Sequence, residues 1–278
     1  MAENIFFSVI IPTFNRKSFL ERAVDSVLSQ TWKDLELIVT DDGSTDDTGS
    51  FMETVRDDRV RYLKLPHLGV SSARNSGIRA ASGDNLAFLD SDDYWVPEKL
   101  ERTAWYMSRF PEISIFHTEE TWLRRGKILS QKKKHAKPEG RVFRQALPLC
   151  CIGMSTAVVK RKVFNAIGLF DETFEACEDY DLWLRAANLY DVKLIPEPLT
   201  VKNGGRPDQL SVKTWGLDRF RIKALEKMLI SGELTEEDRA ATLTELSLKC
   251  GIFAMGCEKR SRSSEAEYYR GLPLSYLR

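Results

Sequence analysis

Short apolar runs rich in β-branched residues alternate with helix patterns along the first part of the chain. Strands are predicted at 5–12, 35–40, 60–66 and 86–89, and helices at 18–30, 48–56 and 69–83. Strands that alternate with helices of this length indicate a largely parallel sheet with helices on both faces. The sequence therefore predicts an α/β fold built around one such sheet.

The remainder of the chain is less regular. After a helix near 98–110, further strands are predicted near 113–118, within 153–164 and at 192–203. The polar stretch 124–141 suits a hairpin or a mobile loop, and its cluster 132–134 of lysines suits a solvated tip. A helix opens at Glu178, and beyond about residue 212 the chain is predicted to be helical to its end. The core side of the helix that opens at Glu178 is predicted to comprise Trp183, Ala186, Ala187 and Tyr190.

Polar residues directly follow three of the predicted strands. These strand ends read PTFNR at 12–16, DDGSTD at 41–46 and DSDD at 90–93. In open parallel sheets, ligands bind in the crevice beyond the carboxyl ends of the strands. The three polar ends therefore mark the expected binding site.

Three aspartates, Asp90, Asp92 and Asp93, fall within the third of these ends. Like charges this close repel, so a cation is expected to join them. Neither glycine-rich phosphate-binding pattern, GxGxxG or GxxxxGK[ST], follows any strand, so a bound nucleotide would need a metal to neutralise its phosphates. Asp90 and Asp92 could hold Mg²⁺ or Mn²⁺ together with phosphate oxygens and water. Alternatively, these aspartates only shape a turn before a helix that starts near Pro97.

A second acidic group occupies the start of the helix that opens at Glu178. Glu178, Asp179 and Asp181 lie in its first turn, where carboxylates interact favourably with the helix dipole. That interaction alone could explain their presence. A carboxylate that is ionised near neutral pH and points into a cleft could instead serve as a general base. The residues leave both interpretations open.

Charge and cysteine content argue against several classes of protein. Lys plus Arg and Asp plus Glu both number 41, a balance that does not favour nucleic-acid binding. The first residues lack the basic and apolar regions of a signal peptide, and no run of about 18 apolar residues suggests a membrane span. The five cysteines form no C-x-x-C pair, which argues against a zinc site or a disulfide framework. We therefore expect a cytoplasmic protein with reduced thiols.

Six motifs of this chain together resemble those of family-2 glycosyltransferases of the glycosyltransferase A fold. In chain order they are SVIIPTFNR, LSQTW, ELIVTDDGSTDDT, GVSSARNSGI, FLDSDDYW and EDYDLWLR. Each motif is weak alone, but six in the same order are highly specific. The resemblance extends over roughly residues 5 to 210, about three quarters of the chain.

The resemblance implies a Rossmann-like, mostly parallel central sheet plus a C-terminal helical extension. It divides the chain into a nucleotide-sugar-binding half at 1–119, an acceptor-binding half with the catalytic base at 120–210, and the extension at 211–278. The implied reaction moves a hexosyl or N-acetylhexosaminyl group from a nucleotide diphosphate donor, usually a UDP-sugar, to an acceptor hydroxyl with inversion. The implied setting is surface polysaccharide or glycoconjugate synthesis, with a saccharide, lipid-linked or protein acceptor.

The nucleoside side of the site follows from the same resemblance, position by position. Asp42 matches the acid that hydrogen-bonds the base, usually uracil. Arg74 and Asn75 match residues near the ribose and the diphosphate. The nucleoside pocket itself is implied at Pro12, Thr13, Asn15 and Arg16.

The resemblance also implies the catalytic side. Asp90, Ser91 and Asp92 match the D-x-D motif that contacts the nucleotide sugar, with Asp92 as the ligand of Mn²⁺ or Mg²⁺. Asp179 matches the general base of the E-D pair, whereas Asp93 has no implied role.

The chain departs from relatives at two places. The Q-x-x-R-W motif of processive synthases is absent, so single transfer is expected. Many relatives carry a metal-binding histidine where this chain reads VKNGGRPDQLS, and Arg206 and Asp208 there have no assigned role. Two alternatives stay open: a sugar nucleotidyltransferase, disfavoured because PTFNRKSFL has no glycine, and a non-catalytic nucleotide-sugar-binding protein, disfavoured by the acids at 92 and 179.

The apolar residues of the C-terminal helices have three open interpretations. They could dock on the catalytic domain, form a homodimer, or contact the inner face of a membrane beside EKRSRS at 258–263. Packing on the domain or on a partner chain is preferred. These residues are Leu243, Leu246, Leu248, Ile252, Phe253 and Met255.

Overall fold

The structure is a computed structural model that describes residues 5–124, 126–130, 135–205 and 214–277. The chain forms two compact units that are interleaved in sequence, and each is described by itself. The first unit comprises Met1–Gly140, Cys151–Glu172 and Tyr190–Gly205, and the second comprises Arg141–Cys150, Thr173–Leu189 and Arg206–Arg278. The three sequence segments with boundaries at 119/120 and 210/211 remain a prediction.

A nine-stranded sheet forms the centre of the first unit, in the order β3-β2-β1-β4-β8-β6-β9-β5, with β7 paired to β6. The strands are β1 (Phe7–Thr13), β2 (Leu35–Asp41), β3 (Val60–Lys64), β4 (Asn85–Phe88), β5 (Tyr94–Trp95), β6 (Ile115–Arg124), β7 (Lys127–Leu129), β8 (Val158–Lys160) and β9 (Val192–Gly204). β3, β2, β1 and β4 run parallel, and β6 runs parallel to β9. β8 is antiparallel to both β4 and β6 and joins the two parallel groups. The predicted α/β class is confirmed.

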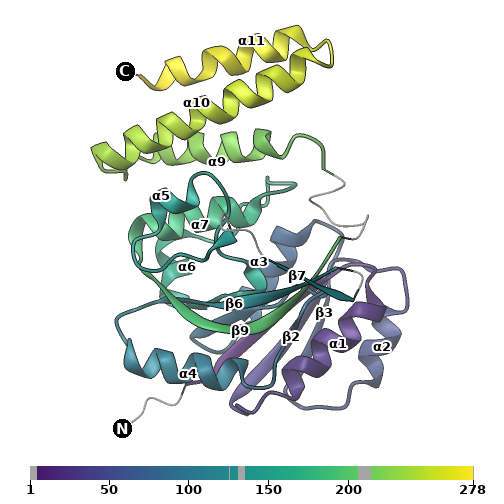
Figure 1. Cartoon of the computed structure of the whole chain (residues 1–278). Helices are drawn as coiled ribbons and strands as arrows, with labels where there is room; N and C mark the ends of the chain where they lie inside the picture. Colours follow the sequence, from purple (N-terminus) through teal and green to yellow (C-terminus); the bar gives the residue numbers. More distant parts are fainter. Residues whose placement is uncertain (1–4, 125, 131–134, 206–213, 278) are drawn as a thin grey trace. The chain divides into compact units, whose positions relative to one another are not determined.

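Helices cover both faces of this sheet (Figure 1). They are α1 (Lys17–Leu28), α2 (Thr48–Thr54), α3 (Val70–Ala80), α4 (Lys99–Arg109) and α6 (Arg161–Ile167). The apolar doublets of α1 bury Leu20, Val24 and Val27 in the core, as their helical spacing predicts. On α3, small residues allow close packing on the sheet, because a Cβ added at Gly77 would lie only 2.5 Å from Ile10.

The central strands are buried along their whole length. Every residue of β1 and β2 is buried, which is typical of parallel strands covered by helices on both faces. The two-residue strand β5 was not predicted, because so short a segment carries no periodic pattern. Of the two alternatives for 124–141, the structure has the hairpin, because β7 pairs antiparallel with β6. The lysine cluster 132–134 lies outside the described residues.

The second unit is helical over the residues described. Its helices are α5 (Phe143–Ala146), α7 (Glu178–Leu189), α9 (Leu217–Ser231), α10 (Glu236–Glu258) and α11 (Ser263–Gly271). Trp183, Ala186 and Ala187 of α7 are buried as predicted. The prediction for Tyr190 was wrong: α7 ends at Leu189, so Tyr190 no longer follows the helical phase and is only half-buried. No helix among the described residues is long and apolar enough to cross a membrane.

Candidate active site

The three polar strand ends meet at one edge of the sheet. β1 and β2 are parallel, so Thr13 pairs with Asp41 at their common carboxyl end. β4 lies parallel on the other side of β1, and its chain continues directly into Asp90. The arrangement matches the expectation that polar strand ends form a site in an open parallel sheet.

The segment after β1 is tied to the segment after β2. Pro12 and Thr13 end β1 and are buried. Asn15 has a positive φ of 51°, a conformation that asparagine tolerates better than most residues. Its side-chain oxygen accepts hydrogen bonds from the backbone N–H groups of Thr45 (2.7 Å) and Asp46 (3.2 Å). Asn15 therefore fixes the relative position of two strand ends.

Asp42 is buried and holds the loop after β3. Its carboxylate accepts hydrogen bonds from the backbone N–H groups of Leu68 (2.8 Å) and Gly69 (3.0 Å), and it lies 2.7 Å from Nδ1 of His67. The His67 ring stacks on Phe14, with centroids 4.0 Å apart and planes 13° from parallel. Sequence reasoning missed both rings, although an aromatic residue within PTFNR and a histidine just after a strand were visible signals.

Two of the strand-end acids, Asp90 and Asp92, are paired with arginines of the protein. Nη1 of Arg16 lies 3.0 Å from Oδ2 of Asp92, and Nη2 of Arg74 lies 2.8 Å from Oδ1 of Asp90. Burial opposes the negative charge of Asp90, but Arg74 and Lys202 outweigh it and hold the pKa of Asp90 below its ordinary value. Asp90 and Asp92 therefore each have an arginine as a cationic partner.

Asp93 is buried, and hydrogen bonds hold both oxygens of its carboxylate. The hydroxyl of Ser155 donates a 2.6 Å hydrogen bond to its Oδ2, and the backbone N–H of Asn203 donates a 3.0 Å bond to its Oδ1. Ser155 also accepts a bond from the backbone N–H of Asp90. Burial and the neighbouring carboxylates raise the pKa of Asp93 to about 7, against the effect of Lys202. Asp93 thus ties the turn after β4 to the end of β9.

Ser91 and Asn75 are both buried. The Asn75 amide nitrogen donates to the backbone oxygen of Phe170 (2.9 Å) and to Glu172 (2.8 Å), and its oxygen accepts from the N–H of Phe170 (3.0 Å). This contact places Phe170 near Arg74, whose guanidinium carbon lies 5.3 Å from the ring centroid. The predicted contact of Asn75 with the ribose or diphosphate remains a prediction.

A divalent metal fits this site only if phosphates and water supply the ligands that the described side chains do not. Among the residues the structure describes, no group of three or more His, Cys, Asp or Glu side chains could hold a metal. Mg²⁺ and Mn²⁺ sites of this kind commonly take one or two carboxylates and complete their shell with phosphates and water. The Asp92 carboxylate supplies a suitable hard oxygen donor, so the chemistry fits an ion that arrives with a diphosphate.

Asp179 belongs to the second unit, in the first turn of α7. Its Oδ1 accepts a 2.7 Å hydrogen bond from the backbone N–H of Tyr180, and its Oδ2 lies 3.5 Å from Sγ of Cys150. Within the described part of the chain, Asp179 makes no ion pair. Asp181, in contrast, is buried and contacts Arg185 (2.8 Å) and Lys227 (2.7 Å).

The structure therefore groups the donor-side residues in the first unit and places Asp179 in the second. Glu178, the neighbour of Asp179, is buried. Cys150 was not predicted as a site residue, since nothing in the sequence pairs it with a helix that starts 28 residues later. Arg206 and Asp208 lie outside the described residues.

Comparison with known structures agrees with the fold. The structure of residues 1–349 of S. aureus TarS has a TM-score of 0.69 and 17% identity, and the match covers 98% of this chain and 91% of that one. The mannosyltransferase PcManGT from Pyrobaculum calidifontis, solved with GDP-Man and Mn²⁺, has a TM-score of 0.60 at 17% identity, covering 98% and 86%. At these identities the likeness shows the fold alone, which is the predicted glycosyltransferase A fold.

Sequence comparison gives the family. WfaP of Escherichia coli, a UDP-Glc:alpha-D-GlcNAc-diphosphoundecaprenol beta-1,3-glucosyltransferase, is 34% identical over 181 residues, which are 64% of this chain and 68% of WfaP. The uncharacterized glycosyltransferase RP339 of Rickettsia prowazekii is 30% identical over 199 residues, 66% of this chain and 60% of that protein. The match to the family described as Glycosyl transferase family 2 spans residues 8–168, more than half of the chain. The protein belongs to glycosyl transferase family 2.

Proposed function

We propose that the protein transfers a sugar from a UDP-sugar to an acceptor hydroxyl, with inversion at the anomeric carbon and with Mn²⁺ or Mg²⁺ as cofactor. The observation that carries the proposal is the meeting of Asp42, Asp90 and Asp92 with two arginines at one sheet edge of a family-2 protein. The names of two similar proteins support uridine: WfaP uses UDP-Glc, and TarS was solved with UDP-GlcNAc.

On the donor side, each strand end has its own part. Asp42, held by the loop after β3, accepts a hydrogen bond from the base, and the stacked pair of Phe14 and His67 borders it. Arg16 and Arg74 bring positive charge to the diphosphate. Asp92 would hold the metal, which would supply positive charge to the leaving diphosphate. Arg16 is paired with Asp92 in the structure, and we expect it to turn to the phosphates when a nucleotide diphosphate binds.

On the acceptor side, Asp179 removes the proton of the acceptor hydroxyl. The oxygen of that hydroxyl forms a bond to the anomeric carbon while the bond from this carbon to the diphosphate breaks, so the configuration inverts in one step. The N–H of Tyr180 and the thiol of Cys150 contact the carboxylate and orient it, and neither group brings a positive charge to it. An unneutralised carboxylate is what a general base requires.

The acceptor is proposed to be a saccharide on a diphospholipid, used in the synthesis of a surface glycoconjugate. WfaP acts on such an acceptor by its name. An acceptor of this kind would place the reaction in the cytoplasm at the inner face of the membrane. The transferred group is proposed to be a hexosyl or N-acetylhexosaminyl group, which the UDP-sugars named for these relatives carry.

Donor turnover tests the proposal. The protein with Mn²⁺ is incubated with a panel of UDP-sugars, with a synthetic GlcNAc-diphospholipid or with water as the acceptor. Released UDP is quantified, and the anomer of the new product is read by NMR. We expect UDP release and an inverted anomer. A product with retained configuration would contradict the displacement, and a UDP-sugar that binds but is never consumed would favour the non-catalytic alternative.

A further inference from the structure

One face of α10 is apolar and exposed. Leu248, Ile252 and Met255 are 56%, 48% and 53% exposed, whereas Leu246 and Phe253 of the same helix are buried. From Ala240 to Cys257 the charged residues are Glu245 and Lys249, which pair with each other at 3.0 Å. Four helical turns of α10 therefore present an uncharged face that the second unit does not cover.

The residues along this face have a symmetric spacing. An α-helix has 3.6 residues per turn, so side chains of one stripe recur every three or four residues. About the central residue Leu248 the steps are 4, 3, 4, 4, 3 and 4, and they read the same in both directions. In an ideal helix all seven positions lie within about 40° of the direction of Leu248. The stripe comprises Glu237, Ala241, Thr244, Leu248, Ile252, Met255 and Lys259.

Side chains at equal distances on the two sides of Leu248 are complementary in size or charge. Positions four residues from Leu248 are Thr244 and Ile252, and positions seven residues away are Ala241 and Met255, so a small side chain matches a large one each time. The outermost pair is an acid, Glu237, and a base, Lys259. A stripe that is complementary to its own reverse suits an antiparallel helix pair with a two-fold axis.

We propose that this stripe is a homodimer interface in which α10 pairs antiparallel with α10 of a second copy of the chain. Leu248 meets the partner's Leu248 on the axis, Ile252 meets the partner's Thr244, and Glu237 meets the partner's Lys259. Antiparallel helices that cross at about 20° interlock in this way. The stripe is about 33 Å long, from the rise of 1.5 Å per residue. One helix per protomer makes a small interface, so the dimer is weak and depends on concentration.

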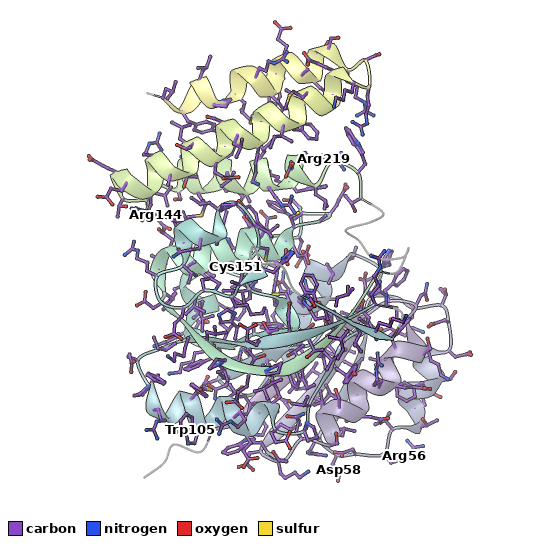
Figure 2. The ribbon with its side chains drawn as sticks, viewed as in Figure 1. Arg56, Asp58, Trp105, Arg144, Cys151 and Arg219 are labelled. Carbon is purple, nitrogen blue, oxygen red and sulfur yellow. The ribbon has the colours of Figure 1, made fainter. Side chains whose placement is uncertain are left out.

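The charges at the two ends favour a second copy over a lipid surface. A helix that lies on an anionic bilayer typically carries basic residues along its polar flank. Here one end is basic, with Lys259, but the other presents the exposed acids Glu236 and Glu237. Arg144, labelled in Figure 2, contacts Glu237 at 2.7 Å, yet the Glu237 side chain stays 82% exposed. An end whose acids are balanced by arginines gains little from an anionic bilayer, whereas the exposed Glu237 carboxylate can still meet the partner's Lys259.

Sedimentation velocity tests the interface. Over roughly 1 to 100 µM, a range suited to weak interfaces, the intact protein should shift from monomer to dimer. Leu248→Glu places two carboxylates on the axis and should leave the protein monomeric throughout. The control is Ile230→Glu, because Ile230 is 70% exposed on α9 and lies outside the stripe, so this variant should still dimerise. Both altered side chains are exposed, and unchanged melting temperatures would confirm that both variants fold.

Cysteine cross-linking tests the antiparallel register. A disulfide needs Cβ atoms within about 4.5 Å. Leu248→Cys lies on the axis and should cross-link to itself under mild oxidation, whereas Ile230→Cys, in the same background of native thiols, should not. Ile252→Cys lies about 12 Å from its own copy, so it should cross-link only when mixed with Thr244→Cys.

Two kinds of result would overturn the proposal. A monomer at every concentration, or Ile252→Cys that cross-links to itself, would exclude the antiparallel dimer. Anionic phosphatidylglycerol vesicles that bind the protein as a monomer, with binding lost in Leu248→Glu, would assign the stripe to a bilayer instead.

Discussion

Two stretches of this chain each carry three acids within four residues, at 90–93 and at 178–181, and the fold gives them different surroundings. At the sheet edge, Asp90 and Asp92 each contact an arginine, and Asp93 is fixed by Ser155 and a backbone N–H. At the start of α7, Asp181 contacts two cations, while Asp179 contacts a thiol and a backbone N–H.

The difference teaches that acid spacing alone does not define a role. Paired arginines beside Asp90 and Asp92 suit a site that handles a negatively charged diphosphate, because the cations can be shared with phosphates. Uncharged donors beside Asp179 suit a carboxylate that must stay ionised and yet accept a proton. In each stretch, one further acid, Asp93 or Asp181, is used to hold the structure.

The largest effect is expected for Asp179→Asn. The amide keeps the size of the carboxylate but cannot accept the proton, so turnover should fall by roughly 10²–10⁴-fold, the usual worth of a positioned acid or base. UDP affinity should change little, and the lost dipole interaction should lower stability by only about 0.3–1 kcal/mol. Turnover, calorimetry and melting temperature on one preparation check this. Near-normal turnover would end the general-base assignment.

Substitution of the two neighbouring acids at the sheet edge, Asp92 and Asp93, should have different effects on metal-dependent UDP binding. Asp92→Asn removes the proposed metal ligand. The gain in UDP affinity that Mn²⁺ provides should therefore fall by more than about 10-fold, because the loss of a residue that only supports a metal ligand already lowers metal affinity by about that factor. Asp93→Asn is the matched control: it should leave most of that gain intact. A larger loss of metal-dependent binding in Asp93→Asn would place the metal ligand one residue later.

Asp181→Asn should affect stability and spare activity. The carboxylate is buried, and its removal leaves Arg185 and Lys227 without their shared anion. Because both cations are partly exposed, we expect a loss of about 1–3 kcal/mol in the free energy of unfolding. Denaturant unfolding measures this loss. If turnover per folded molecule fell as far as in Asp179→Asn, the division of roles within α7 would be wrong.

The smallest effect is expected for His67→Ala. The ring stacks on Phe14 and contacts Asp42, so its loss should weaken UDP binding by roughly 2- to 10-fold, in line with about 0.5–1.5 kcal/mol for an aromatic pair. The metal dependence of binding should be unchanged, as calorimetry with and without Mn²⁺ can show. An altered metal dependence would mean that the loop after β3 supports the metal site as well.

The repeating elements and the grouping of the three polar strand ends could be predicted from the sequence. Apolar runs such as 35–40 and the doublets of α1 carry their own periodicity, and polar strand ends of a parallel sheet must gather at one edge. Partners of the site residues could not be predicted. The pairing of Arg16 with Asp92 joins residues 76 positions apart, and the Cys150–Asp179 contact spans 29. Such contacts join residues that are far apart in the sequence and depend on the tertiary structure, so local sequence patterns do not predict them.

The central proposal is that Asp92 would hold a divalent metal, in place of its contact with Arg16, when a uridine diphosphate binds. Titration calorimetry of UDP into the intact protein, once with Mn²⁺ and once with EDTA, tests it most directly. The account predicts that UDP binds more tightly than ADP or GDP with Mn²⁺, and that affinity for UDP falls by more than about 10-fold in EDTA. Undiminished affinity in EDTA would contradict the account and leave the Arg16–Asp92 pair as a structural contact.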